Sequence, residues 1–298
     1  MKINIKIIGI LFLLSAFTGC IKEGLEECPA NVRVNIFVEK FQNKSQDPLA
    51  DTEEIFNSRV SHLRYYLYKD NELVSEVTKN DFSDVTGSYY SLNFSSLNPG
   101  NYHLVLVANS SKDALQGDCV KADNLCLSFP GCSDTEDYFS AILPFTVQPD
   151  AVQEFDVGLL RTQGMIRFIF NNLPSHITAF EMTIQNISSE KWITGDYKSS
   201  CEANHKYSVV TVDTDDSPYR MWVFPTISDS QSAYRLMLHS ESKARPPLAE
   251  DLSGNIFITR NQLVDVVLTF EGENIVDIEI ILDAAWDGTT PGGNIDID

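Results

Sequence analysis

Residues 32–41 read VRVNIFVEKF, and this stretch introduces the pattern that most of the chain repeats. Apolar and polar residues alternate in it, so one side of an extended chain carries only apolar side chains, those of Val32, Val34, Ile36 and Val38. Such alternation is typical of a β-strand with one face in a core and the other in water. The pattern predicts a strand over residues 32–38.

Comparable runs continue along the chain. HLRYYLYKDNELVSEV, from residue 62, predicts a hairpin that turns at Asp70 and Asn71. Residues 102–108 are apolar at neighbouring positions, which predicts a strand buried on both faces. The second half has seven strand-like runs, GMIRFIFNNLP, AFEMTIQNIS, KYSVVTVDT, YRMWVFPT, SAYRLMLHS, NIFITRNQLVDVVLTF and NIVDIEIILDAAW. Because no long amphipathic helical pattern competes with them, the sequence predicts an all-β fold.

The strands fall into two blocks of similar length. Together the blocks span more residues than one domain usually holds, and each carries about seven short strands, as a β-sandwich does. We therefore expect one sandwich over residues 30–158 and a second over residues 159–298. The second ends in a short flexible tail in which Ile295 and Ile297 alternate with acids. That tail is either a frayed end or a strand for a neighbour's sheet edge.

The N-terminal segment has the anatomy of a secretory signal. Lys2 and Lys6 precede an apolar run over residues 7–17, which is shorter than the roughly 20 residues of a membrane-spanning helix. The run ends in FTGC, which resembles a bacterial lipobox with its cysteine at Cys20. Residues 1–19 are thus expected to be a lipoprotein signal peptide. The alternative is a plain secretory signal with Cys20 unmodified.

Lipidation of Cys20 would tie the mature chain to a membrane. Lipoprotein maturation puts several acyl chains, such as palmitate, on one cysteine, and each buried CH₂ contributes about 0.8 kcal/mol. Residues 20–29 then form an acidic tether containing Glu23, Glu26 and Glu27. The tether resembles the surface-export signal of Bacteroidota lipoproteins, although charge alone would also keep it solvated. We expect a lipid-anchored outer-membrane protein exposed at the cell surface.

The cysteines beyond Cys20 suit an oxidising compartment. Cys119, Cys126 and Cys132 lie in one loop-like stretch whose spacing matches no common zinc motif. We expect Cys28 to form a disulfide with one of these three, which the spacing does not distinguish, and Cys201 to stay a free thiol.

Several functions are not supported by the composition or by motifs. A formal net charge of −20 disfavours binding to nucleic acid. The motifs of zinc proteases, serine hydrolases, P-loop NTPases and dinucleotide-binding enzymes are missing, and the five histidines are scattered. The acids from Asp213 lack the glycine and glutamate of an EF-hand. Trp192, Trp222 and Trp286 could stack on sugars. Core packing is the expected role of Trp222 and Trp286, which lie in or at the end of strand runs, and the role of Trp192 stays open. We expect no enzyme, cofactor, metal or small-molecule substrate.

Four segments together resemble the FimB-like fimbrial anchor family of Bacteroides and Porphyromonas relatives. The first is CIKEGLEECP, residues 20–29, after the lipobox and before an alternating strand. The second is the Leu-x-Pro-Gly-x-Tyr turn and apolar strand over residues 97–109. The third is Leu159-Leu160-Arg161, and the fourth is the closing strand from Ile275 to Trp286.

This resemblance implies two transthyretin-like Greek-key sandwiches in tandem. It also implies a minor fimbrium anchoring subunit that holds a fimbrium (pilus) base to the outer membrane, limits its length and contacts a fimbrial stalk subunit by strand exchange. The alternative is a surface adhesin or glycan-binding lipoprotein of the same architecture. A bare sheet edge would favour the anchor, and exposed aromatics clustered around Trp192 would favour the adhesin.

Overall fold

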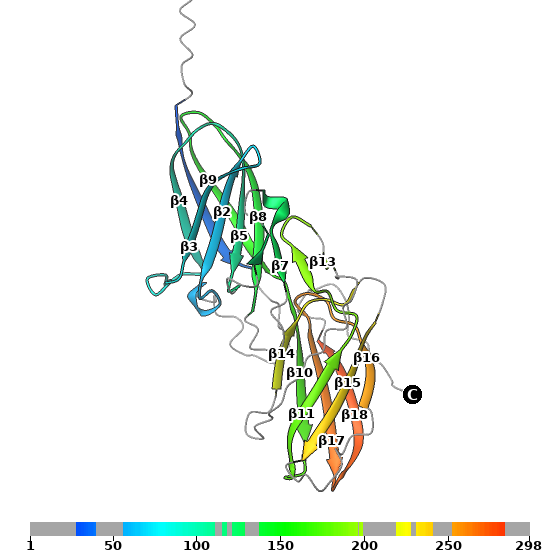
Figure 1. The fold of residues 1–298 in the computed structure, drawn as a ribbon. Coiled ribbons are helices and arrows are strands. Elements are labelled where there is room, and N and C mark those ends of the chain that lie inside the picture. Colours follow the sequence, from blue (N-terminus) through cyan, green and yellow to red (C-terminus); the bar gives the residue numbers. More distant parts are fainter. Residues whose placement is uncertain are drawn as a thin grey trace, which may run out of the picture.

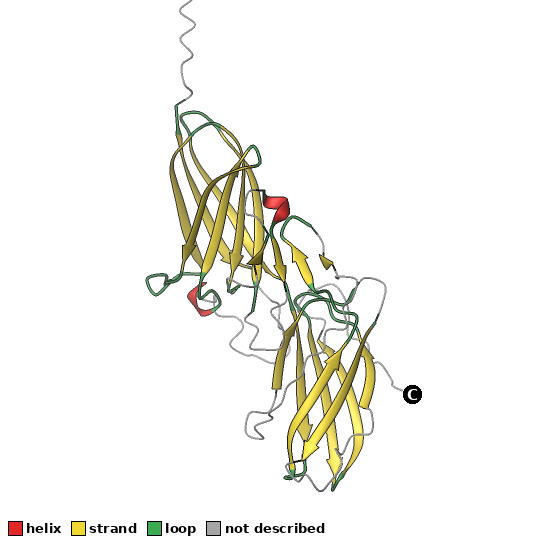
Figure 2. Cartoon of the chain, viewed as in Figure 1, coloured by secondary structure: helices red, strands yellow, loops and turns green. Residues whose placement is uncertain are grey.

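The structure is a computed structural model that describes residues 28–39, 56–110, 115–117, 121–128, 137–195, 197–198, 219–227, 231–240 and 252–283. In these ranges the regular structure is β-strand apart from two 3₁₀ turns, Phe56–Ser58 and Ala122–Asn124. Two β-sandwiches lie end to end (Figures 1 and 2). The all-β prediction is confirmed.

Seven strands build the first sandwich. One layer has the order β4-β1-β9 and the other the order β3-β2-β5-β8. The layers join along one side, where β8 and β9 pair at Phe139–Arg161 and Ser140–Leu160. The strands are β1 (Ala30–Val38), β2 (Leu63–Lys69), β3 (Glu72–Lys79), β4 (Tyr89–Leu97), β5 (Gly100–Ala108), β8 (Phe139–Val147) and β9 (Val152–Arg161).

The alternation that opens the sequence produces the core of this sandwich. In β1 the side chains of Val32, Val34 and Ile36 are buried and Val38 packs at the edge of the same cluster. The predicted hairpin is also confirmed, because β2 and β3 are joined by Asp70 and Asn71, whose φ angles are 50° and 68°. These left-handed conformations suit the tight turn between twisted strands.

Among the described residues, seven further strands build the second sandwich, in layers of order β14-β10-β17-β18 and β11-β15-β16. Its core cluster includes Phe168, Phe180 and Val264, which are buried. The strands are β10 (Gly164–Asn171), β11 (Ile177–Ile184), β14 (Tyr219–Val223), β15 (Ser232–Ser240), β16 (Leu252–Ile256), β17 (Leu263–Glu271) and β18 (Asn274–Asp283). Since β9 ends at Arg161 and β10 begins at Gly164, the chain passes from the first sandwich to the second between these residues.

A small third sheet connects the two sandwiches, and the sequence reading did not anticipate it. Its order is β13-β12-β7-β6. The strands β6 (Leu115–Gln116) and β7 (Cys126–Ser128) come from the stretch that was expected to be a loop, whereas β12 (Glu190–Trp192) and β13 (Tyr197–Lys198) come from the second half.

The small sheet explains why β5 is apolar on both faces. Leu104 and Leu106 point into the first sandwich, while Val105 and Val107 belong to a third cluster with Leu127 of β7. The same cluster contains Ile193 and Phe224 from the second half. The predicted burial of both faces is confirmed, and the outer face is covered by elements from both halves of the chain.

Some sequence-based expectations lie outside the described residues. They concern the signal peptide and tether before residue 28, the KYSVVTVDT run, the acidic stretch from Asp213, Trp286 and the C-terminal tail. In the part of the chain that the structure covers, no helix is long and apolar enough to cross a membrane.

Candidate functional site: the tether end, the domain junction and the open edges

The chain enters the first sandwich at the end remote from the second sandwich (Figure 1). There the backbone N–H of Asp150, in the β8–β9 turn, donates to the carbonyl of Cys28 at 3.4 Å. The N–H of Asn31 donates to the carbonyl of Ala151 at 3.2 Å. Cys20 itself lies outside the described residues, so its lipidation stays a prediction. A tether attached before residue 28 would therefore emerge at this tip.

The predicted disulfide from Cys28 does not form in the structure, where Cys28 is a free and exposed thiol. Cys126 is buried in β7, at the junction end of the first sandwich. Cys119, Cys132 and Cys201 lie outside the described residues.

The Cys28 thiol is expected to be alkylated in folded, non-reduced protein. Asp150 raises the pKa of this thiol, first through a side-chain hydrogen bond and then through its negative charge. Since only the thiolate reacts, alkylation should be slow at neutral pH, and Asp150→Asn should accelerate it. Asparagine also tolerates the positive φ of 55° at this position. Iodoacetamide labelling followed by peptide mass spectrometry measures both effects. Recovery of Cys28 in a disulfide-linked peptide would contradict this expectation and support the disulfide that the sequence predicted.

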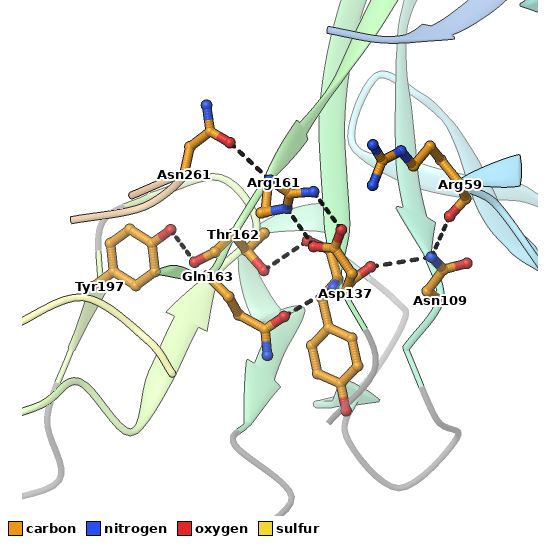
Figure 3. A network of polar contacts seen from close by, with 9 residues as sticks. Arg59, Asn109, Asp137, Arg161, Thr162, Gln163, Tyr197 and Asn261 are labelled. Carbon is orange, nitrogen blue, oxygen red and sulfur yellow. Dashed lines mark hydrogen bonds and ion pairs between the residues drawn. The ribbon is translucent and has the colours of Figure 1, made fainter. Parts of the chain in front are cut away.

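Arg161 is the centre of the domain junction (Figure 3). Its guanidinium donates to both carboxylate oxygens of Asp137, at 2.5 and 2.6 Å, and to Oδ1 of Asn261 at 3.0 Å. The charged group also lies 4.8 Å from the ring centre of Trp222 and 5.5 Å from that of Phe139. Because the Arg161 side chain is only 2 % exposed, the bidentate pair and the two rings replace the water that it loses.

A second layer of hydrogen bonds surrounds this pair (Figure 3). The backbone N–H of Tyr138 donates to Oε1 of Gln163 at 2.9 Å, and the hydroxyl of Tyr197 donates to the carbonyl of Thr162 at 2.6 Å. The side-chain amide of Asn109 donates to the carbonyls of Arg59 and Asp137. The connection between the two sandwiches is therefore held by side chains from both, not by a bare linker.

The junction side chains are a finding that sequence reasoning missed. Arg161 was noted only as part of the Leu159-Leu160-Arg161 motif, and Asp137 was given no role. The available signal was an arginine that directly follows the apolar end of a strand, since a buried arginine needs a carboxylate partner. That partner lies 24 residues earlier, and spacing alone does not reveal it.

The open sheet edges are the second candidate feature. In the described residues, β4 has a strand partner only on its β1 side, and none of its nine residues, YYSLNFSSL, is charged. By contrast β18, an edge of the second sandwich, carries Asp277 and Glu279 and has a register shift where it passes Val276. Charges and bulges protect an edge against added strands, so β4 is the less protected of the two.

The tryptophans do not form an exposed aromatic cluster in the described part of the chain. Trp222 lies under Arg161, and Trp192 is half-buried in β12 opposite Cys126 of β7. Tyr197, beside them in the small sheet, packs against buried Phe224. Packing roles therefore hold for Trp192 and Trp222. Among the described residues no group of histidine, cysteine and acidic side chains is placed to hold a metal ion.

Two end-to-end sandwiches that share a small sheet define an elongated two-domain β-sandwich protein. A family model for "Fimbrillin-A associated anchor proteins Mfa1 and Mfa2" matches residues 25–289. The chain therefore belongs to this family of fimbrial anchor proteins, which confirms the resemblance drawn from the sequence. Membership implies a fimbrium-associated role at the cell surface.

Solved structures share the fold at low sequence identity. The fimbrial anchor protein Mfa2 from Porphyromonas gingivalis is 13% identical, with a TM-score of 0.52 over 86% of this chain and 98% of that chain. A candidate adhesin from Bacteroides ovatus is 11% identical, with a TM-score of 0.55 over 86% and 94%. A candidate polysaccharide-binding protein from Bacteroides thetaiotaomicron is 12% identical, with a TM-score of 0.55 over 91% and 99%. No curated protein matches the chain.

Proposed function

We propose that this protein is a non-catalytic outer-membrane lipoprotein that anchors the base of a fimbrium. Family membership is the observation that carries the proposal. The entry point of the chain supports it, because Cys28 lies at the tip of the first sandwich that is remote from the second. A lipid on Cys20 would hold that tip at the membrane and direct the second sandwich away from it. Each sandwich is proposed to have a transthyretin-like topology.

We further propose that the anchor joins the fimbrial stalk subunit by strand pairing. An extended segment that adds to a sheet edge gains main-chain hydrogen bonds, and its alternate side chains give specificity. The uncharged β4 edge is suited to such a partner. The partly buried rings of Tyr90 and Phe94 lie on its core side, where alternate apolar side chains of the partner would pack. Because an anchor that occupies the base leaves no free site there, it would also limit fimbrial length.

One observation favours glycan binding as a second candidate. Phe37 of β1 and Tyr89 of β4 are direct cross-strand neighbours, and their side chains are 36% and 53% exposed. Two neighbouring aromatic rings on a sheet surface offer a flat apolar area, on which a sugar ring can stack. An adhesin of the same architecture would use this outer face and would not need a fimbrial partner.

Affinity purification from detergent-extracted outer membranes tests the proposal. With a tag on this protein, a fimbrial stalk subunit is expected as the main copurifying protein, because the anchor holds the base of the filament. A version lacking residues 288–298 tests whether the tail supplies the exchanged strand, and undiminished binding would assign the exchange to a sheet edge. If no fimbrial subunit copurifies while the protein binds a glycan array, the adhesin role replaces the anchor role.

A further inference from the structure

β1 has an unusual place for the first strand of a domain. It lies inside its layer, between the antiparallel β4 and the parallel β9, so both of its edges are paired. The pairing with β9 is continuous from Asn31–Val152 to Val38–Leu159. It is extended at both ends by the bonds of Asn31 to Ala151 and of Glu39 to Leu159. The N-terminal entry of the chain is therefore fixed by hydrogen bonds along both edges of β1.

The direction of β9 connects this strand pair to the second sandwich. Because β9 is parallel to β1, it runs from the tether tip towards the junction (Figure 1). It ends at Arg161, whose side chain holds Asp137 and Asn261, and the chain continues directly into β10. β10 repeats the arrangement, since it lies between antiparallel β14 and parallel β17. A straight covalent path thus links β9 to the distal end of β10.

Side chains strengthen the contact between β4, β1 and β9. The amide of Asn35 donates to Oε1 of Glu154 at 2.8 Å and to Oδ1 of Asp156 at 2.9 Å. Its Oδ1 accepts from the hydroxyl of Ser91 at 2.8 Å. One side chain therefore bridges all three strands near the middle of the layer. Arg33 adds a bond to Asn93 at 3.2 Å.

We propose that β1 and β9 form a shear clamp that resists tension applied between the N-terminal tether and the second sandwich. Pulling the start of β1 away from the junction makes it slide along β9 and β4. All of the hydrogen bonds between the strands are then loaded together, because both force and sliding run along the strands. If β1 and β9 were pulled apart at one end, the same bonds would break one after another. The proposal rests on the anchoring role only for the source of the force.

Single-molecule force spectroscopy with two pulling directions tests the clamp on one protein. The chain from residue 21 onward carries an N-terminal handle, and the second handle is an azide-bearing amino acid at Ser175 or at Val152. Ser175 is exposed beyond the far end of β10, so this pair loads β1 along its length. Val152 is 85% exposed and pairs with Asn31 at the tether tip, so this pair opens the same two strands from one end.

The unfolding force is expected to be at least about twofold higher with the Ser175 handle than with the Val152 handle. Forced unfolding depends on the unfolding rate, and the barrier to unfolding is higher when many hydrogen bonds must break together. The contour length that is released identifies the sandwich that yields. Equal forces in the two directions, or a lower force with the Ser175 handle, would overturn the clamp. Since the chain lacks Cys20 and no fimbria are present, failure here is independent of failure of the anchoring role.

A pair of matched substitutions tests the bridging role of Asn35. Asn35→Ala is expected to raise the unfolding rate at a fixed force by about fivefold with the Ser175 handle, which corresponds to about 1 kcal/mol. Asn101→Ala is the control, because Asn101 accepts a bond from Thr146 between β5 and β8, away from the clamp. The control should leave the rate unchanged. Equal effects of the two variants would contradict a localised clamp.

Discussion

Cys20→Ala is expected to move the protein out of the outer-membrane fraction almost completely. The variant should accumulate as an unprocessed precursor or be released, and fimbriae should be shed into the medium. The reason is the size of the lipid contribution, since each buried CH₂ of an acyl chain supplies about 0.8 kcal/mol and several chains share one cysteine. Cell fractionation with immunoblotting, and electron microscopy of the medium, measure the two outcomes.

Cys28→Ala is the matched control for this experiment. It removes the next cysteine along the chain, which is a free thiol at the start of the first sandwich. That variant should fractionate with the outer membrane as the unchanged protein does. Normal fractionation of Cys20→Ala would show that the membrane attachment does not depend on this residue. The lipoprotein hypothesis would then be lost, whereas family membership would be unaffected.

Arg161→Ala is expected to lower the free energy of unfolding by about 3–5 kcal/mol, the usual effect of breaking a buried ion pair. The substitution leaves the Asp137 carboxylate, which is 16% exposed, without its bidentate guanidinium. It also removes the stacking contacts to Trp222 and Phe139. Because Arg161 holds residues from both sandwiches, we expect one cooperative unfolding transition to become two. Urea titration followed by circular dichroism and tryptophan fluorescence measures both effects.

Two controls separate the junction from arginine loss in general. Arg33→Ala removes an arginine that bonds Asn93 on the exposed face of β1, and it should change stability by about 0.5 kcal/mol or less. Arg161→Lys retains the charge but cannot form the bidentate pair, so it should recover only part of the loss. A loss below about 1 kcal/mol for Arg161→Ala would mean that the small sheet and its apolar cluster hold the junction without the ion pair.

The local pattern predicted much of the fold because it depends only on neighbouring residues. Val32, Val34 and Ile36 alternate with polar residues, and a strand with period two must place them on one side. The turn at Asp70 and Asn71 follows from the tolerance of these residues for positive φ. The division of the strands into two blocks could likewise be read from the sequence. These features are local, so they do not depend on how the strands pack against one another.

The candidate site depends on residues that are distant in the sequence, which is why sequence reasoning found little of it. The stretch between Ser110 and Asp137 shows no alternation, so its strands β6 and β7 were missed. They are only two and three residues long, and β7 pairs with β12, which comes from the other half of the chain. Strands so short are stabilised by tertiary packing and not by their own pattern.

The cysteines show the same limit, because here the sequence predicted a contact that the structure does not contain. Sequence separation allowed Cys28 to approach the loop-like stretch, and a bridge was expected there. The tertiary structure instead places Cys28 at the tether tip, beside Asp150, and Cys126 in the small sheet, opposite Trp192. Where Cys28 lies is set by the direction in which β1 enters the sheet, and the spacing of the cysteines does not contain that information.

The sequence by itself determined the all-β class, the two blocks of strands, the lipobox pattern at Cys20 and the family resemblance. Each of these follows from the order and spacing of nearby residues. Only the tertiary structure decided that Arg161 meets Asp137 and Asn261, that β1 runs parallel to β9, and that a small sheet covers Val105 and Val107. The physical reason is that strand pairing and buried ion pairs join residues far apart in the chain, and their partners are selected by how the whole molecule packs.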